Sequence, residues 1–177
     1  NPSSSHGFGA ANRAGIEQAR ERLSLLLGCE ASELIFTSGA TESNNMVIKG
    51  IAKSAGKGKH FITSRIEHPA VLEPCRHIER FGYSVTYLPV DRFGLVDPAD
   101  LEKAIRPETA LVTIMHSNNE VGTIQDVKEL TSIASSRGVP FHSDAAQSVG
   151  KVRVNVEELG VDFLTVAGHK FYAPKGI

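Results

Sequence analysis

Short apolar segments alternate with helix-like segments along nearly the whole chain, and this alternation restricts the fold more than any other feature. Apolar residues at helical spacing predict the helices, and short apolar runs predict the strands. Strands that alternate with helices imply a mainly parallel sheet covered by helices on both faces. The sequence therefore predicts an α/β fold, a three-layer sandwich with a mainly parallel central sheet, and its 177 residues favour one domain.

The predicted elements follow one another without an internal repeat, a low-complexity tract or a second-domain linker. Helices are expected at residues 10–27, 42–54, 69–81, 97–105 and 127–136. Strands are expected at residues 33–37, 60–64, 85–88, 111–115, 139–142 and 163–166. Gly28 stands where the first helix is expected to end, because glycine is the usual residue just past a helix C-terminus.

Charge and cysteine content narrow the class of partner. The chain has 19 Lys and Arg against 20 Asp and Glu, without a long run of either sign, so nothing favours nucleic acid or an anionic membrane. No stretch approaches the roughly 20 apolar residues of a membrane span. Cys29 and Cys75 lack the spacing of a metal or redox site, and both are expected to be structural. We expect a small-molecule ligand and a cytoplasmic protein, or one of an organelle matrix if a transit peptide precedes this chain.

Five polar clusters each follow a predicted strand. In an open parallel sheet, ligands bind beyond the carboxyl ends of the strands, so these clusters are expected to meet at one site. The clusters are Ser38–Glu42, Glu67–His68, His116–Glu120, Ser143–Gln147 and Gly168–Lys170.

The first cluster places small residues at a helix start. Free backbone N–H groups and the helix dipole can hold a phosphate there, and the Thr41 hydroxyl can add a contact. The alternative is that Ser38 or Thr41 simply caps the helix, since both residue types are favoured caps. Neither of the common nucleotide-binding glycine motifs is present.

Asp144 and Lys170 together suggest a specific cofactor. A pyridoxal 5'-phosphate site needs a lysine that forms a Schiff base and commonly an acid that keeps the pyridine nitrogen protonated. Taken singly, a lysine after a strand is usually a solvated surface residue, and an aspartate there is usually a cap or turn residue. The two residues alone leave both interpretations open.

Five segments, in this order, resemble the cysteine desulfurase and selenocysteine lyase family within the fold-type I, class V aminotransferase-like enzymes. The resemblance covers essentially the whole chain and implies that residues 1–177 are most of a pyridoxal-phosphate-binding large domain, without its N-terminal segment. It also implies a full-length homodimer that removes sulfur or selenium from L-cysteine or L-selenocysteine and leaves L-alanine. The segments are Thr37–Asn44, Glu67–His68, Asn118–Glu120, Asp144–Ser148 and Gly168–Tyr172.

The resemblance implies a role for each residue that contacts the cofactor ring. Lys170 would form the Schiff base, and Asp144 would bind the pyridine nitrogen. Gln147 would donate to the phenolic oxygen, and Asn119 would lie beside the ring and the substrate carboxylate. His68 would stack on the ring and assist proton transfer, which suits an imidazole near neutral pH. Without the family, His68 is better explained as a helix-start residue packed under a loop.

The resemblance also implies a phosphate site with one departure from the family. Backbone groups of Ala40 and Thr41, with His169, would hold the phosphate. Bacterial desulfurases of the iron–sulfur type usually have Ser where this chain has Ala167, so that hydroxyl contact is expected to be missing. Ala167 and residues 161–166 look more like the selenocysteine lyase branch. Residues 1–6 also match a family segment near the active site.

The resemblance implies parts that these residues do not include. The family's mobile-loop cysteine, its small C-terminal domain and the arginine that binds the substrate carboxylate are expected beyond residue 177, and the fragment alone is expected to be inactive. A sulfur-acceptor protein is a possible further partner. The alternatives are a class V aminotransferase or kynureninase-like enzyme, and a catalytically silent cofactor-binding fragment.

Overall fold

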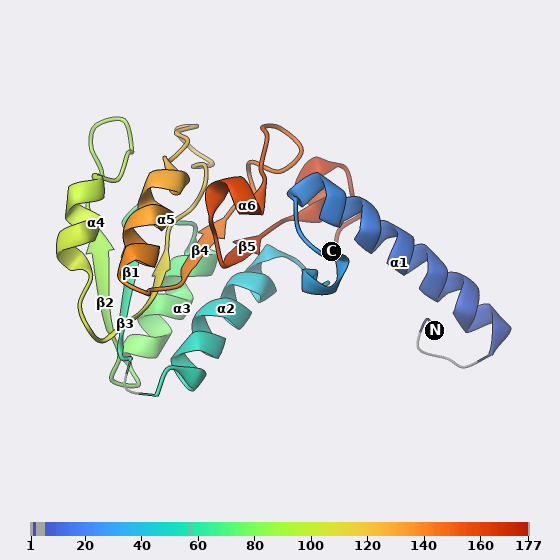
Figure 1. Ribbon diagram of the computed structural model, residues 1–177, viewed down its shortest axis with the longest axis horizontal. Helices are drawn as coiled ribbons and strands as arrows, with labels where there is room; N and C mark the ends of the chain where they lie inside the picture. Colours follow the sequence, from blue (N-terminus) through green and yellow to red (C-terminus); the bar gives the residue numbers. More distant parts are fainter. Residues whose placement is uncertain (1, 3–5, 57, 177) are drawn as a thin grey trace.

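A five-stranded parallel sheet organises the chain (Figure 1). The computed structural model describes residues 2, 6–56 and 58–176. The strand order is β2-β1-β3-β4-β5, and every neighbouring pair is parallel. The predicted α/β fold with a parallel central sheet is confirmed. The strands are β1 His60–Ser64, β2 Ser84–Leu88, β3 Thr109–Thr113, β4 Phe141–Asp144 and β5 Phe163–Thr165.

Helices cover both faces of the sheet, as the alternation predicted. One apolar core lies between the sheet and α2 and α3, and a second lies between the sheet and α4 and α5. Figure 1 shows α1 projecting from this body, with its first turn farthest from the sheet. The helices are α1 Gly7–Leu27, α2 Ala40–Ser54, α3 Pro69–Glu79, α4 Pro98–Ala104, α5 Val127–Ser136 and α6 Val156–Leu159; two short 3-10 helices are η1 Ala31–Glu33 and η2 Gly168–Phe171.

Local sequence signals explain where several helices begin and end. Helix α1 ends as predicted before Gly28, whose φ of 71° is left-handed and whose N–H bonds to the Ser24 carbonyl. Asp97 and Asp126 cap α4 and α5 through their carboxylates. The long helices and five of the expected strands therefore lie within a few residues of their predicted bounds.

The strand expected at residues 33–37 is wrong. Ala31–Glu33 forms a 3-10 turn, and residues 34–37 are irregular. Ile35 is 69% exposed, and Phe36 is exposed as well. This segment and β5 both line an apolar cavity of about 230 Å³, and no strand pairs with the segment in the described part of the chain. The apolar run was a sound signal, but a strand also requires a hydrogen-bonding neighbour.

Two buried histidines join neighbouring strands of the sheet. His60 on β1 bonds to Thr109 of β3 at 2.8 Å and to Thr86 of β2 at 2.9 Å. His142 on β4 bonds in the same way to Thr113 of β3 at 2.7 Å and to Thr165 of β5 at 2.9 Å. Burial lowers the pKa of His60 to about 4 and lowers the pKa of His142 as well. Each ring is therefore neutral near pH 7 and makes one bond on each side.

The two cysteines differ in their surroundings. Cys75 is fully buried on α3, as expected, and burial raises the pKa of its thiol to about 12. Cys29 is only half-buried after α1, and partial burial raises its pKa, with the Glu33 carboxylate as a second cause. Within residues 2, 6–56 and 58–176, no helix combines the length and the apolar character needed to cross a membrane.

Candidate active site

One cavity of about 270 Å³ lies beyond the carboxyl ends of the strands. Its volume is close to the lower end of the range typical for small-molecule sites. Apolar side chains of Ala70, Met115, Ala146 and Ala167 form part of the wall. The structure brings all eight predicted site residues to this cavity: Ala40, Thr41, His68, Asn119, Asp144, Gln147, His169 and Lys170.

The N-terminus of α2 opens into this cavity without a capping side chain. Gly39 has a φ of 140°, which favours glycine, and no side chain accepts from the first amides of the helix. Ser43 is the first residue whose N–H bonds back to Gly39, so the N–H groups of residues 40–42 point beyond the helix. Simple capping by Ser38 or Thr41, the alternative interpretation, is therefore wrong, and the helix start retains its capacity to bind an anion.

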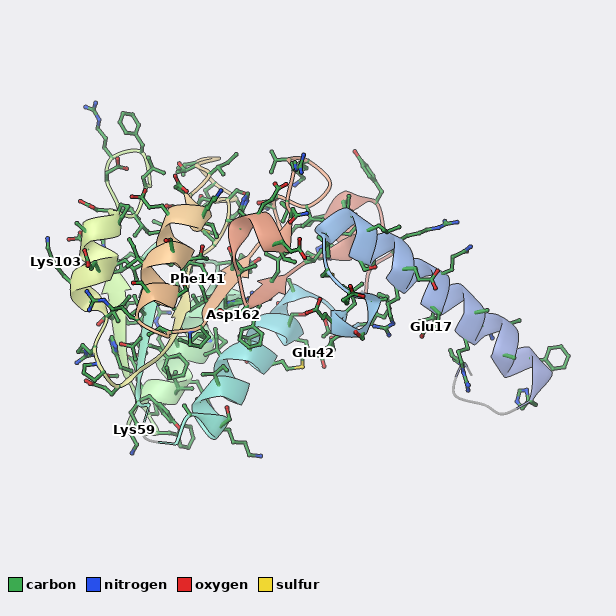
Figure 2. The ribbon with its side chains drawn as sticks, viewed as in Figure 1. Glu17, Glu42, Lys59, Lys103, Phe141 and Asp162 are labelled. Carbon is green, nitrogen blue, oxygen red and sulfur yellow. The ribbon has the colours of Figure 1, made fainter. Side chains whose placement is uncertain are left out.

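Ser38 is engaged by Glu42 instead. Its backbone N–H and its hydroxyl both donate to one carboxylate oxygen of Glu42, each at 2.6 Å. These hydrogen bonds lower the pKa of Glu42. Figure 2 shows Glu42 beside the first turn of α2, so the carboxylate holds the turn before the helix in place.

Asp144 is fixed at the end of β4 by two hydrogen bonds. Its Oδ2 accepts from the side-chain amide of Asn44 at 2.8 Å, and its Oδ1 accepts from the N–H of Ala146 at 2.9 Å. Asp144 is 5% exposed, and that exposure lies at the cavity. No role was assigned to Asn44 from the sequence, although its helical spacing from Ile48 places both residues on one face of α2.

Lys170 lies on η2, the 3-10 turn that follows β5. Its backbone N–H bonds to the carbonyl of Ala167 at 3.0 Å. Ala167 is fully buried and lines the cavity with a methyl group, so this position offers no hydroxyl, as expected from the sequence. Phe171 packs directly against Gly150, where an added Cβ would lie 2.7 Å from the Phe171 Cβ. The position of Lys170 therefore depends on the close contact between Phe171, the next residue in the chain, and Gly150.

His68 both starts a helix and faces the cavity. Its Nδ1 accepts from the N–H of Ala70 at 3.0 Å, which makes it the N-cap of α3. Since Nδ1 accepts, the ring proton of neutral His68 lies on Nε2. The helix-start role and the cavity position thus occur together in one residue.

Asn119 and Gln147 bring two side-chain amides to the cavity. Asn119 is exposed at the edge of the cavity. The Oε1 of Gln147 accepts from Lys151 at 2.8 Å, and its amide N–H₂ is left to donate. His6 begins the first described helix, and the other residues of the expected N-terminal segment fall largely on positions 1 and 3–5, outside the described residues.

Glu67, to which no role was assigned from the sequence, is a buried neighbour of the cavity residues His68 and Met115. Its Oε1 accepts from the Ser64 hydroxyl at 2.7 Å and from the N–H of Met115 at 2.8 Å. Its Oε2 is buried without a hydrogen-bond partner. Burial raises the pKa of Glu67 to about 8, so the carboxyl is mostly neutral at pH 7.

The chain is an open α/β domain with a lysine, a buried carboxylate and an uncapped helix start at the carboxyl edge of its parallel sheet, which are features suited to a small anionic ligand. The model of the Aminotransferase class-V family matches residues 1–177, and the chain belongs to this family.

Known proteins resemble the chain over its whole length. It is 57% identical to "Cysteine desulfurase IscS" of Dictyoglomus turgidum, covering 100% of the chain and 45% of that protein. It is 53% identical to "Cysteine desulfurase, mitochondrial" of Arthroderma benhamiae, covering 100% of the chain and 36% of that protein. A solved structure, "SspA in complex with cysteine", is 45% identical with a TM-score of 0.96, covering 99% of the chain and 51% of that protein.

The chain spans about half the length, or less, of these relatives. The class V aminotransferases and the cysteine desulfurases depend on pyridoxal phosphate. The resemblance seen in the five sequence segments is therefore confirmed at the level of the family.

Proposed function

We propose that this chain is the pyridoxal-phosphate-binding large domain of a cysteine desulfurase, which removes sulfur from L-cysteine and leaves L-alanine. The observation that carries the proposal is that Lys170, Asp144 and the uncapped start of α2 border one cavity of about 270 Å³. These three features match the aldehyde, the pyridine nitrogen and the phosphate of the cofactor.

The residues present fit this cofactor. The free N–H groups after Gly39 and the positive end of the α2 dipole suit a phosphate, with the Thr41 hydroxyl and His169 beside them. The buried carboxylate of Asp144 suits a protonated ring nitrogen. When bound, the cofactor supplies an electron sink for the carbanion formed at the substrate Cα.

The chain's own residues would position the reactants and move protons. Lys170 would bind the cofactor covalently through Nζ and, once displaced by the substrate amine, would move a proton at the substrate Cα. His68 would lie against the ring, with the Nε2 proton available for transfer. The amide of Gln147 would donate to the phenolic oxygen, and Asn119 would contact the substrate carboxylate.

The proposed substrate is cysteine rather than selenocysteine. Ala167 resembles the selenocysteine lyase branch, but its effect is the loss of one phosphate contact and not a contact to the substrate. The relatives described above are named cysteine desulfurases, and one solved neighbour is titled as a complex with cysteine. Cysteine is therefore the first substrate to test.

The proposal extends to the full-length protein. A small C-terminal domain would supply the nucleophilic cysteine, because Cys75 is buried with a raised pKa and Cys29 lies outside the cavity. We also propose a homodimer, a sulfur-acceptor protein and a role in iron–sulfur cluster assembly. The cytoplasm or an organelle matrix is the proposed location.

The test is covalent labelling of the full-length protein. Pyridoxal phosphate is added, the bound cofactor is reduced with borohydride, and the modified lysine is located by peptide mass. The label is expected on Lys170 alone, and L-cysteine is expected to give L-alanine. Lys170→Ala should abolish both, and Lys175→Ala, which removes a nearby exposed lysine, should leave both unchanged.

Three results would contradict parts of the proposal. A Lys170→Ala protein that keeps the cofactor absorbance and the label would exclude Lys170 as the attachment point. Turnover of kynurenine or of amino donors without alanine from cysteine would indicate another class V activity. A labelled Lys170 without any turnover would indicate a silent cofactor-binding protein.

A further inference from the structure

A buried hydrogen bond joins the helix that starts at the anion site to the acid of the same cavity. The Nδ2 of Asn44 on α2 donates to the Oδ2 of Asp144 on β4 at 2.8 Å, across 100 residues of sequence. Asn44 is 0% exposed and Asp144 is 5% exposed. A hydrogen bond between an amide and a buried carboxylate is among the stronger kinds, because one partner is charged.

Apart from this hydrogen bond, the buried position of Asn44 is unfavourable for a side-chain amide. Asn44, Ile48 and Ala52 form the buried stripe of α2, where an apolar residue would pack without desolvating an amide. The Oδ1 of Asn44 is buried without a partner. Since a carboxylate only accepts hydrogen bonds, Asn44 must present its Nδ2 to Asp144 and leave Oδ1 unsatisfied. The amide is thus oriented for Asp144 alone.

Helix geometry gives the bond a function. Asn44 lies four residues after Ala40, about 6 Å along the helix axis from the start of α2. The same rigid helix therefore offers N–H groups to an anion at its first turn and fixes a carboxylate one turn later. One helical turn and one hydrogen bond therefore set the distance between the N–H groups at the start of α2 and the Asp144 carboxylate.

Other charged or titratable groups also face Asp144. The Asp144 charge acts on His142, two residues earlier on β4, and on Glu67 from the loop after β1. Lys170 and His169 from η2 and His68 from the start of α3 line the same cavity. The hydrogen bonds to the Asp144 carboxylate come instead from the side chain of Asn44 and the N–H of Ala146.

We propose that Asn44 is a positioning residue that orients the Asp144 carboxylate toward the ring nitrogen of the cofactor and fixes its distance from the phosphate cradle. This inference rests on the proposed function, because it assigns Asn44 a role toward the same cofactor. Asn44 does not contact the cofactor in this role. It acts through Asp144, and removing its donor should weaken cofactor binding without altering the lysine.

The test compares Asn44→Asp and Asn44→Leu in the full-length protein, with pyridoxal phosphate affinity measured across pH. Asn44→Leu keeps the side-chain size and removes the donor, so the Kd should rise roughly tenfold or more at every pH. Asn44→Asp places two carboxyls in contact, which cannot both ionise cheaply. At about pH 6 the new carboxyl keeps a proton and can donate it to Asp144, so the Kd of this variant should stay close to the wild-type Kd. At about pH 9 this proton is lost, and the Kd should rise roughly tenfold.

Asn45→Asp is the matched control, because it makes the same change one residue later on the half-buried side of α2, where the amide donates to the Thr41 carbonyl. Its Kd relative to wild type should not vary with pH. If Asn44→Leu fails to fold, the pH-dependent ratio of Asn44→Asp to wild type still decides.

A pH-independent ratio for Asn44→Asp, or wild-type affinity for Asn44→Leu, would overturn the proposed role of Asn44. Wild-type protein that gives no borohydride label on Lys170 would overturn the proposed function, and the inference about Asn44 with it. The two failures are distinguishable, because the first leaves Lys170 labelled in the wild type and in every variant.

Discussion

The carboxyl group of Glu67 accepts a hydrogen bond from the backbone N–H of Met115 at 2.8 Å, although the residues are 48 positions apart. Glu67 directly precedes His68, and Met115 follows β3 on the way to Asn119. The bond therefore ties together the two loops that carry these cavity residues. Because the carboxyl is buried, its protonation state affects both the stability and the arrangement of these loops.

Glu67→Gln should make the protein more tolerant of alkaline pH. Burial raises the native pKa of Glu67 from 4.5 to about 8, so its stabilising contribution is complete below 4.5 and is lost as the pH rises through 8. The loss approaches about 1 kcal/mol per pH unit for one proton. Glutamine mimics the neutral carboxyl, so the urea midpoint of this variant should fall less than that of wild type between pH 4.5 and about 8, the window set by the two pKa values.

Glu73→Gln is the control for this measurement. Glu73 lies on the exposed face of α3 and pairs with Arg76, so its loss should shift the midpoint little and without this pH dependence. Parallel pH profiles for wild type and Glu67→Gln would show that the Glu67 carboxyl is ionised in the native protein.

His60→Gln should reduce sensitivity to acid. The native pKa of His60 is lowered from 6.5 to about 4 by burial, with the Arg106 charge as a second cause. The unfolded chain therefore takes up a proton first as the pH falls below 6.5, and stability falls by about 1 kcal/mol per pH unit until the native ring also titrates near 4. Thermal midpoints between these two pH values should decline less in His60→Gln than in wild type.

His77→Gln, a change at an exposed histidine of α3, should keep the wild-type slope. An unchanged slope in His60→Gln would mean that the acid sensitivity arises elsewhere, with His142 as the next candidate because it bridges two threonines in the same way.

Most of the fold and the site could be predicted from the sequence because both depend on local patterns. Parallel strands end at one edge of the sheet, so the residues that follow β1, β3, β4 and β5 had to meet there once the alternation was recognised. The expected strand at residues 33–37 failed because pairing is a non-local property, and no strand in the described residues reaches that segment.

The parts of the site that were missed are second neighbours of the cavity. Asn44 belongs to the buried stripe with Ile48, and Glu67 bonds to the N–H of Met115, but neither partner can be read from a single sequence. Helical spacing shows that Asn44 faces the interior, and only the packing of α2 on β4 shows that it meets Asp144. The sequence can therefore indicate a buried polar residue without its partner.

Gly150→Ala should displace Lys170, because the added methyl group would press against Phe171, the next residue in the chain. Gly150 has a φ of +79°, and an added Cβ would lie 2.7 Å from the Cβ of Phe171. Backbone strain should cost about 1 kcal/mol, and relief of the contact must displace η2, which carries Lys170. We expect a lower thermal midpoint together with slower labelling of Lys170 by pyridoxal phosphate and borohydride.

Gly138→Ala separates the two effects, because Gly138 has a φ of +67° and open space around the added Cβ. It should lower the midpoint through strain alone and leave the labelling rate unchanged. Equal labelling rates in the two variants would show that the Gly150 contact with Phe171 does not set the position of Lys170.

The hydrogen bonds of Asn118 should stabilise the conformation of the loop that carries Asn119. Its Oδ1 accepts from the N–H groups of Glu120 and Val121 at 2.9 and 3.0 Å, and its Nδ2 donates to the Ile66 carbonyl at 3.0 Å. Asn118→Ala removes all three bonds and should lower the free energy of unfolding by about 2 kcal/mol.

Asn118→Asp tests which of these bonds matters for the cavity. The carboxylate keeps both acceptor bonds within the loop but cannot donate to Ile66, so the loop retains its turn and loses its attachment to the segment that leads into His68. Cofactor affinity should therefore fall nearly as much in Asn118→Asp as in Asn118→Ala, while the loss of stability should be smaller. If Asn118→Asp binds the cofactor as wild type does, the turn alone positions Asn119, and the bond to Ile66 contributes only to stability.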